Sequence, residues 1–272
     1  MINIVSDKNV MNSQIISKEE TEILLDKESP KIYEVIRVIE GRTIFLKEHF
    51  ERMNESIRLS GTNGCINYDE FKSSIELLIK ENSFKHCNIR VSYYYKNEPV
   101  IIFYFIKSYY PSKEEFNEGI HTVTVKMERT NPNIKSFQKE LKDNVARIMK
   151  ENNAFEAILI NHDDTVSEGS RSNVFFVKGN KLITSPDSLV LLGVTRSKVI
   201  SICEENLIKV EKRKIIFDEI KEFDGAFITG TSNDVLPIKT FDNILFNSSE
   251  NEVVKKVSEL YLREVRKEIE VK

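Results

Sequence analysis

The sequence predicts a mixed α/β (α+β) protein with two domains. Three observations predict this class: β-branched runs that alternate in polarity, stretches with apolar residues at helical spacing between them, and one charged stretch without apolar periodicity near residue 115. A length of 272 residues fits one large or two modest domains, at about 150 residues per domain. We therefore expect a small N-terminal domain at 1–110, a linker at 111–119 and a larger domain at 120–272.

Composition excludes several classes of protein. The chain has 40 Lys plus Arg against 43 Asp plus Glu, a formal net charge of −3, which argues against a basic nucleic-acid-binding surface. No run reaches the roughly 18 apolar residues of a membrane span, and the N-terminus does not resemble a signal peptide. The three cysteines and four histidines have no disulfide or metal-ligand spacing. We expect buried thiols, no metal, no membrane partner and a cytoplasmic location.

In the small domain, residues 1–31 are polar and are expected to be irregular. Residues 33–39 and 43–46 predict a hairpin around Glu40–Arg42, because both runs are rich in β-branched residues. The further elements expected here are helices at 47–60 and 68–82 and strands at 89–95 and 99–106, the two strands joined at 96–98.

In the larger domain, a strand at 121–127 and a helix at 137–151 come first. A three-stranded meander is expected next, at 156–161, 173–178 and 181–184. The remaining elements expected are a helix at 195–206, strands at 208–215 and 225–229, and a terminal helix at 249–268. Ser249, followed three residues later by Glu252, predicts a capping box for that last helix.

Two segments carry side chains that are open to two interpretations. Lys135 precedes the helix expected at 137–151. It is either a solvated lysine of the first turn, the simpler interpretation, or a desolvated lysine available for a Schiff base. Glu168 lies in a Gly/Ser-rich break between apolar strands. It is either a carboxylate exposed at a turn or a buried one, and a buried carboxylate needs a cationic partner.

Two further segments could face a phosphate. Thr195 begins an apolar-periodic helix after Gly193, so it is either an ordinary N-cap or part of an anion site made by helix N–H groups. The segment 227–232 ends a strand in small hydroxyl residues, which is typical of a turn and could also contact phosphate.

Taken in order, these segments resemble the fold-type IV pyridoxal-phosphate enzymes. That family includes branched-chain and D-amino-acid aminotransferases and aminodeoxychorismate lyase. The resemblance covers residues 33 to about 240. The segments that carry it are 33–38, 48–53, 133–136, 168–173, 193–196, 229–231 and 235–237.

The resemblance implies a role for each matching residue. Lys135 resembles the Schiff-base lysine, and Glu168 resembles the carboxylate that keeps the pyridine nitrogen of pyridoxal 5′-phosphate protonated. Leu191 matches the aliphatic residue on the ring face. The residues that match further cofactor contacts, chiefly to the phosphate, are Arg52, Val194, Thr195, Gly230 and Thr231. Tyr33 and Ser232 match the substrate side of the pocket.

The resemblance also implies a fold and an activity. The fold is a small α/β sandwich followed by a larger pseudo-barrel domain, with the cofactor between them, usually in a homodimer. The activity is amino-group transfer between an amino acid and a 2-oxo acid. Two alternatives stay open: a lyase that forms 4-aminobenzoate and pyruvate from 4-amino-4-deoxychorismate, and a non-catalytic member of the family.

The chain departs from the family pattern on the substrate side. Residues 26–32 lack the arginine and the Gly-Asp-Gly-like turn that commonly precede the first motif. Residues 93–96 read Tyr-Tyr-Tyr-Lys where many relatives have Arg-Gly, an arginine that some use for the substrate carboxylate. The carboxylate trap of D-amino-acid enzymes is therefore not recognisable from the sequence.

Overall fold

The structure is a computed structural model that describes residues 3–27, 32–62, 64–95 and 99–270. Much of the atypical segment 26–32, and the turn expected at 96–98, lie outside the described residues. The chain forms two compact units, the first made of residues 1–109, 134–137 and 265–272 and the second of 110–133 and 138–264. By this division, two segments expected in the larger domain, 134–137 and 265–272, fall in the first unit.

The first unit is built on a six-stranded sheet in the order β2-β1-β6-β5-β3-β4, in which each neighbouring pair is antiparallel. Its strands are β1 (Lys8–Met11), β2 (Gln14–Ser17), β3 (Ile32–Ile39), β4 (Arg42–Thr43), β5 (His86–Tyr95) and β6 (Pro99–Ile106). Its helices are α1 (Lys18–Lys27), α2 (Leu46–Leu59) and α3 (Tyr68–Asn82). The expectation of an irregular segment at 1–31 was wrong, since β1, β2 and α1 lie there.

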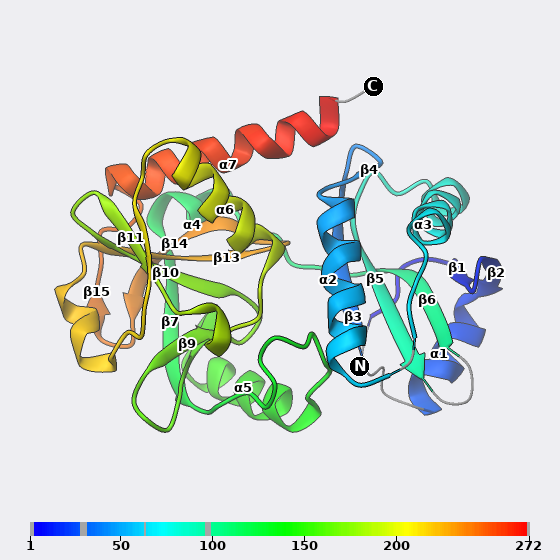
Figure 1. The fold of residues 1–272 in the computed structure, drawn as a ribbon, viewed down its shortest axis with the longest axis horizontal. Coiled ribbons are helices and arrows are strands. Elements are labelled where there is room, and N and C mark those ends of the chain that lie inside the picture. The colour runs from blue at the N-terminus through cyan, green and yellow to red at the C-terminus, as the bar shows by residue number, and fades with distance from the viewer. Residues whose placement is uncertain (1–2, 28–31, 63, 96–98, 271–272) are drawn as a thin grey trace. The chain divides into compact units, whose positions relative to one another are not determined.

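Helices cover both faces of this sheet (Figure 1). Met53 of α2 and Phe71 of α3 share one buried cluster with Ile36 of β3 and Phe103 of β6. The opposite face carries a smaller cluster, in which the partly buried Leu24 of α1 packs with buried Tyr104 and its neighbours. Successive residues of a strand point to opposite faces. The side chains of Tyr33 and Glu34, which are adjacent on β3, therefore point to opposite faces of the sheet.

The hairpin from β3 to β4 is confirmed, but its second strand is shorter than expected. Glu40 and Gly41 both have positive φ, 53° and 78°, as the tight turn of a two-residue hairpin requires. The expected strand at 43–46 ends at Thr43, because Phe45 is also left-handed, with φ of 54°. The chain turns there, and α2 begins at Leu46.

The second unit contains a nine-stranded sheet whose main path runs β12-β11-β10-β13-β14-β7-β8-β9, with β15 added to β14. The strands are β7 (Ile120–Lys126), β8 (Glu156–Ile160), β9 (Val166–Gly169), β10 (Asn173–Lys178), β11 (Lys181–Thr184), β12 (Val210–Lys212), β13 (Gly225–Gly230), β14 (Asp234–Phe241) and β15 (Ile244–Leu245). Pairing is parallel for β11 with β12, for β14 with β7 and for β7 with β8, and antiparallel elsewhere.

This sheet curls until its two ends meet. Val166 of β9 donates its N–H to the carbonyl of Ile215 at 2.8 Å, and Ser185 Oγ, just after β11, donates to the carbonyl of Val166 at 2.7 Å. Both contacts join the β9 end to the β11–β12 end. The curled sheet surrounds an apolar cluster that includes Phe176 and Leu236. The expected pseudo-barrel is confirmed.

The predicted meander was wrong in its connections. The turn at Asp163–Asp164 leads from β8 into β9, which occupies the expected Gly/Ser-rich break and pairs antiparallel with β8. β10 pairs instead with β11 and β13. The sequence also did not predict β14 or β15, because Pro237 and the short run after it lack a clear strand pattern.

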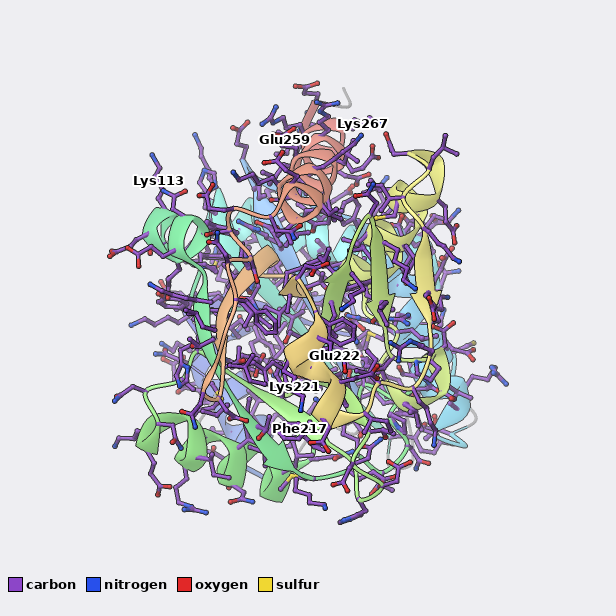
Figure 2. The ribbon with its side chains drawn as sticks, turned by 90° about the vertical axis from the view of Figure 1, so that its left-hand side faces the viewer. Lys113, Phe217, Lys221, Glu222, Glu259 and Lys267 are labelled. Atoms are coloured by element: carbon purple, nitrogen blue, oxygen red, sulfur yellow. The ribbon has the colours of Figure 1, made fainter. Side chains whose placement is uncertain are left out.

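The helices of the second unit are α4 (Lys113–Glu118), α5 (Lys139–Glu151), α6 (Val194–Glu205) and most of α7 (Glu252–Glu270), with short 3-10 turns η1 (Asp187–Leu189) and η2 (Phe217–Glu222). α4 lies within the expected linker, held by a capping box at Ser112 and Glu115. α5 packs on β7 and β8 through Leu141 and Ile148. Lys113 and Lys221 are exposed, whereas Phe217 of η2 packs on the barrel core (Figure 2).

Two smaller findings concern membranes and thiols. Across the described ranges, no helix combines the length and the apolar character needed to cross a membrane.

Cys87 and Cys203 are buried as expected, but Cys65 is exposed. The expectation of three buried thiols was therefore wrong for Cys65, which lies in the connection between α2 and α3.

The N-terminal cap of α7 differs from the one that the sequence predicts. Asn251 Oδ1 accepts hydrogen bonds from the N–H groups of Val253 and Val254 at 3.0 and 3.3 Å. The cap is thus Asn251 and not the predicted Ser249. We expect Asn251→Ala to lower the free energy of unfolding by about 1 kcal/mol and Ser249→Ala to change it little, as measured by urea denaturation. The reverse order would restore Ser249 as the cap.

Candidate functional site

A buried ion cluster joins β3 to α2 in the first unit. Glu34 is fully buried, and Arg52 holds it in a bidentate pair, with Nε to Oε1 at 2.8 Å and Nη2 to Oε2 at 2.7 Å. His49 Nδ1 lies 2.9 Å from Oε2 of the same carboxylate. His49 and Arg52 are three residues apart on α2, so they share one face of the helix. Arg52, predicted to contact phosphate, thus has a second role against Glu34.

The cluster shifts the titration of its members. Burial alone would raise the pKa of Glu34, but the Arg52 charge and the hydrogen bonds from His49 and Arg52 outweigh burial and lower that pKa to about 2. Burial lowers the pKa of His49, against the opposing effect of Glu34. Because the folded pKa of Glu34 lies below its ordinary value of 4.5, its contribution to stability is present above pH 4.5 and is lost as pH falls toward 2.

Lys135 lies beside β3 and not in a helix. Its carbonyl accepts the N–H of Tyr33 at 3.1 Å, its N–H donates to Ser56 Oγ at 3.3 Å, and Ser136 bridges to Ile32. These bonds hold residues 135 and 136 alongside β3. α5 begins at Lys139, so the expected start at Phe137 was wrong. Lys135 Nζ lies 5.0 Å from the centroid of the Tyr33 ring.

Arg90 is a buried cation that no segment of the sequence predicted. It is 6% exposed and lies on β5 with its guanidinium 4.0 Å from the centroid of the same Tyr33 ring. Tyr104 hydrogen-bonds to it and lies 2.9 Å from Ser92 Oγ. Among the described residues, Nε and Nη2 of Arg90 have no hydrogen-bond partner. An unpaired buried guanidinium is costly, and this edge matches the two oxygens of a carboxylate.

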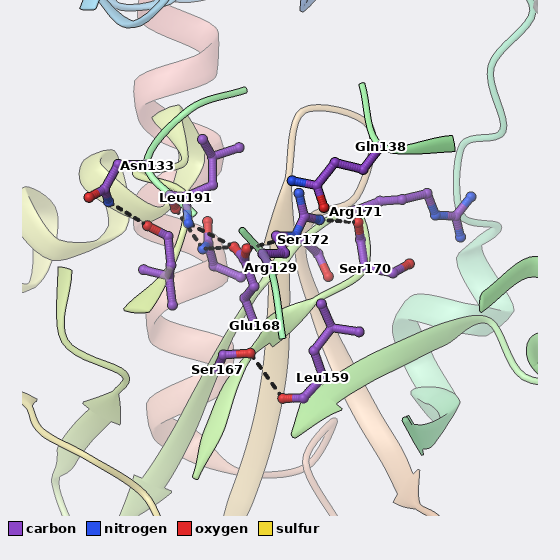
Figure 3. A network of polar contacts seen from close by, with 12 residues as sticks. Arg129, Asn133, Gln138, Leu159, Ser167, Glu168, Ser170, Arg171, Ser172 and Leu191 are labelled. Atoms are coloured by element: carbon purple, nitrogen blue, oxygen red, sulfur yellow. Dashed lines mark hydrogen bonds and ion pairs between the residues drawn. The ribbon is translucent and has the colours of Figure 1, made fainter. Parts of the chain in front are cut away.

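A second buried carboxylate, Glu168, lies on β9 in the second unit (Figure 3). It is 2% exposed, so the interpretation as an exposed turn residue was wrong. Arg129 Nε lies 3.0 Å from its Oε1. Asn173 Nδ2 and the N–H of Leu191 donate to its Oε2 at 3.1 and 3.0 Å. The predicted cationic partner is therefore present, and it is Arg129.

The start of α6 and the turn after β13 supply groups suited to a phosphate. α6 begins at Val194, and its N-cap is Gly193, which has no side chain to cap the first N–H groups. Thr195 is therefore the second residue of the helix and not its N-cap. Gly230, Thr231 and Ser232 form the turn between β13 and β14, and all three are half-buried.

The donor set fits pyridoxal phosphate. Uncapped N–H groups and hydroxyls suit a phosphate, and the buried Glu168 suits a protonated pyridine nitrogen. The buried hydroxyl of Thr229, next to Gly230, has no hydrogen-bond partner within the described ranges. The first unit holds Tyr33, Arg52 and Lys135, and the second holds the other predicted residues, Glu168, Leu191, Val194, Thr195, Gly230, Thr231 and Ser232.

Sequence reasoning missed Arg90, Arg129 and Asn173 as functional groups. Asn173 lies within a motif that carried the resemblance, so its side chain could have been found there. Arg90 is an arginine at an inward-facing position of an apolar strand, which is a usable signal. Arg129 stands in an irregular polar stretch and has no such signal.

Comparison with known proteins gives one family. The model of the class IV amino-transferases matches residues 31–241. A D-alanine aminotransferase of Bacillus licheniformis is 32% identical over 224 residues, covering 78% of this chain and 78% of that protein.

Solved structures agree on the fold. A branched-chain aminotransferase of the thermophilic archaeon Thermoproteus uzoniensis, solved with norvaline, superposes with a TM-score of 0.86 at 24% identity and covers 98% of this chain and 97% of that one. A branched-chain amino acid aminotransferase of Thermobaculum terrenum, solved in its pyridoxal-phosphate form, gives a TM-score of 0.83 at 22% identity, covering 97% and 95%.

The Glu34 cluster can be tested without any ligand. We expect Arg52→Gln to lower the free energy of unfolding of the cofactor-free protein by about 3–5 kcal/mol, because it leaves Glu34 buried without its cation. Urea denaturation at pH 7 measures this. Arg58→Gln, on the same helix but in an exposed pair with Glu55, is the control and should change stability little. Equal effects of the two substitutions would contradict the account.

Proposed function

Because this chain belongs to the class IV aminotransferases, we propose that Lys135 binds pyridoxal 5′-phosphate covalently and that Glu168 faces its pyridine nitrogen. The chain is a pyridoxal-phosphate-dependent aminotransferase, which moves an amino group between an amino acid and a 2-oxo acid. The observation that carries the assignment of Glu168 is the burial of its carboxylate, with an ion-pair partner at Oε1 and two hydrogen-bond donors at Oε2. Such a fixed negative charge favours a protonated ring nitrogen.

When bound, the cofactor supplies an electron sink for the electrons released at the substrate Cα. The residues of the chain do the remaining work. Lys135 Nζ, once released from the cofactor, carries the proton that leaves the substrate Cα. Lys135 Nζ lies 5.0 Å from the centroid of the Tyr33 ring, and the Arg90 guanidinium lies 4.0 Å from the same centroid.

The phosphate would be held by groups from several elements. Val194 and Thr195 offer N–H groups at the start of α6, and Thr195 and Thr231 offer hydroxyls. Gly230 leaves room for the backbone to approach, and Leu191 would cover the ring face. Arg52 already pairs with Glu34 through Nε and Nη2. That pair fixes the orientation of its guanidinium, and we assign Arg52 to the phosphate on the resemblance of its motif.

The substrate carboxylate is assigned to Arg90. The family trap is not recognisable at 93–96, and Arg90 offers two buried N–H groups on one edge of its guanidinium. Tyr33 supports the guanidinium by stacking, and Tyr104 hydrogen-bonds to it. Ser232 completes the substrate side by resemblance. Relatives named for D-alanine and for branched-chain amino acids leave the donor and its enantiomer open.

The covalent assignment predicts a labelled lysine. Reduction of the cofactor-loaded protein with borohydride should fix the label on the peptide that contains Lys135, as read by mass spectrometry. Lys135→Ala should lose the visible absorbance of the bound cofactor and keep its fold, whereas Lys126→Ala, an exposed lysine paired with Asp164, should behave like the wild type. Label on another lysine would refute the assignment. A protein that stays colourless with the cofactor would favour the non-catalytic alternative.

The Arg90 assignment predicts a specific loss. We expect Arg90→Gln to raise KM for the amino donor by about 10–100-fold, since a hydrogen-bonded charge contributes about 1.5–3 kcal/mol, with cofactor affinity unchanged. Arg90→Lys keeps the positive charge but lacks the planar pair of guanidinium N–H groups. It should therefore reverse only part of the rise in KM. A panel of L- and D-amino acids with 2-oxo acid acceptors, and 4-amino-4-deoxychorismate as the lyase substrate, is the assay. An unchanged KM would exclude Arg90, and pyruvate release without an acceptor would favour the lyase.

We also place the enzyme in the cytoplasm as a homodimer. Unpaired Cys65, Cys87 and Cys203 suit a reducing compartment, and the resemblance implies the dimer.

A further inference from the structure

Glu156, at the start of β8, is a second buried carboxylate of the barrel, and none of the assigned roles uses it. It is 0% exposed. Its Oε1 accepts hydrogen bonds from Ser170 Oγ at 2.6 Å and from the N–H of Ala157 at 2.9 Å. Its Oε2 accepts from Ser172 Oγ at 2.9 Å and from the N–H of Arg171 at 3.3 Å. Three of these four donors belong to one loop, residues 170–172, which joins β9 to β10.

The loop is packed tightly around this carboxylate. The N–H of Ser170 also donates to the carbonyl of Ala157 at 2.8 Å. A Cβ at Gly169 would come within 2.0 Å of Ser172 Oγ and 3.2 Å of Glu156 Cγ, so a side chain there would displace the Ser172 hydroxyl. The loop therefore has little freedom to move while Glu156 accepts its donors.

The same loop contacts one partner of Glu168 and directly precedes another (Figure 3). The carbonyl of Ser170 accepts a hydrogen bond from Arg129 Nη2, and Arg129 Nε lies 3.0 Å from Glu168 Oε1. Asn173, the first residue after the loop, donates to Glu168 Oε2 at 3.1 Å. Two of the groups that hold the Glu168 carboxylate thus depend on the position of residues 170–172.

We propose that Glu156 is a positioning residue for the amino-transfer reaction. It fixes the loop 170–172, the loop fixes Arg129 through the carbonyl of Ser170, and Arg129 sets the orientation of the Glu168 carboxylate. This inference rests on the proposed role of Glu168 at the pyridine nitrogen. It assigns to Glu156 no contact with the cofactor or the substrate.

A purely structural role for Glu156 makes a different prediction. If Glu156 only stabilises the turn from β9 to β10, its loss lowers stability and leaves the Glu168 carboxylate in place. Asp242 provides the matched control, because its two oxygens accept the N–H and the Oγ1 of Thr124 at 2.8 Å each. It is a carboxylate of the same unit that also holds backbone and hydroxyl donors, but these belong to β7 and not to the loop 170–172.

The experiment compares Glu156→Gln with Asp242→Asn. The first readout is the nitrogen-15 chemical shift of the pyridine nitrogen in bound, labelled pyridoxal phosphate, which reports the protonation of that nitrogen. We expect Glu156→Gln to move the shift toward the unprotonated value and Asp242→Asn to leave it unchanged, although both lower Tm. The second readout uses the cofactor-free protein. Hydrogen exchange of the Leu191 N–H, which donates to Glu168 Oε2, should become faster only in Glu156→Gln.

A double-mutant cycle with Arg129→Gln tests the route. If Glu156 acts through Arg129, adding Glu156→Gln to Arg129→Gln causes no further change in the nitrogen-15 shift. A wild-type shift in Glu156→Gln, or fully additive effects, would overturn the proposal. If Glu156→Gln does not fold, Ser172→Ala is used in its place, because it removes one of the same hydrogen bonds. Glu168→Gln tests the role of Glu168 separately from that of Glu156. If Glu168→Gln also leaves the nitrogen-15 shift unchanged, the proposed role of Glu168 fails.

Discussion

The proposed site depends on one carboxylate, that of Glu168, which is held inside the barrel by partners from separate segments. A charged carboxylate away from water is costly unless its oxygens are paired. The chain meets this requirement from three separate segments, with Arg129 before α5, Asn173 at the start of β10 and Leu191 before α6. These segments are fixed by a sheet whose ends are joined through Val166. The closure of the barrel is thus what allows the charge to be buried.

The first unit contains two buried charged groups that differ in whether their hydrogen bonds are satisfied. Glu34 is paired with Arg52 and His49 on the face of the sheet that α2 covers, and this pairing is satisfied from within the chain. Arg90, on the opposite face, keeps two donors without a partner among the described residues. A satisfied group needs no ligand, whereas an unsatisfied one is stabilised by an anion. The contrast distinguishes the Glu34 carboxylate, which is satisfied within the fold, from Arg90, which we assign to the substrate.

Local patterns were sufficient for much of the fold. The span of α3 followed from its apolar spacing and came out as expected, from Tyr68 to Asn82, and the hairpin at β3 followed from Glu40 and Gly41. The failures share a cause. Local patterns do not encode the contacts that determine β9, the cap at Asn251 and the start of α5. Two such contacts are the backbone hydrogen bonds from Val166 to Ile215 and from Tyr33 to Lys135. The same holds for Arg129, whose importance appears only when the fold brings it to Glu168.

The central claim is that the negative charge of Glu168 sustains amino transfer. The most direct measurement is the single-turnover rate of the cofactor-loaded enzyme with a saturating amino donor, for the wild type and for Glu168→Gln. We predict that the variant binds pyridoxal phosphate with similar affinity and transfers the amino group about 100-fold or more slowly, as expected on removing a preorganised charge from a reacting centre. An undiminished rate with the cofactor bound would contradict the account.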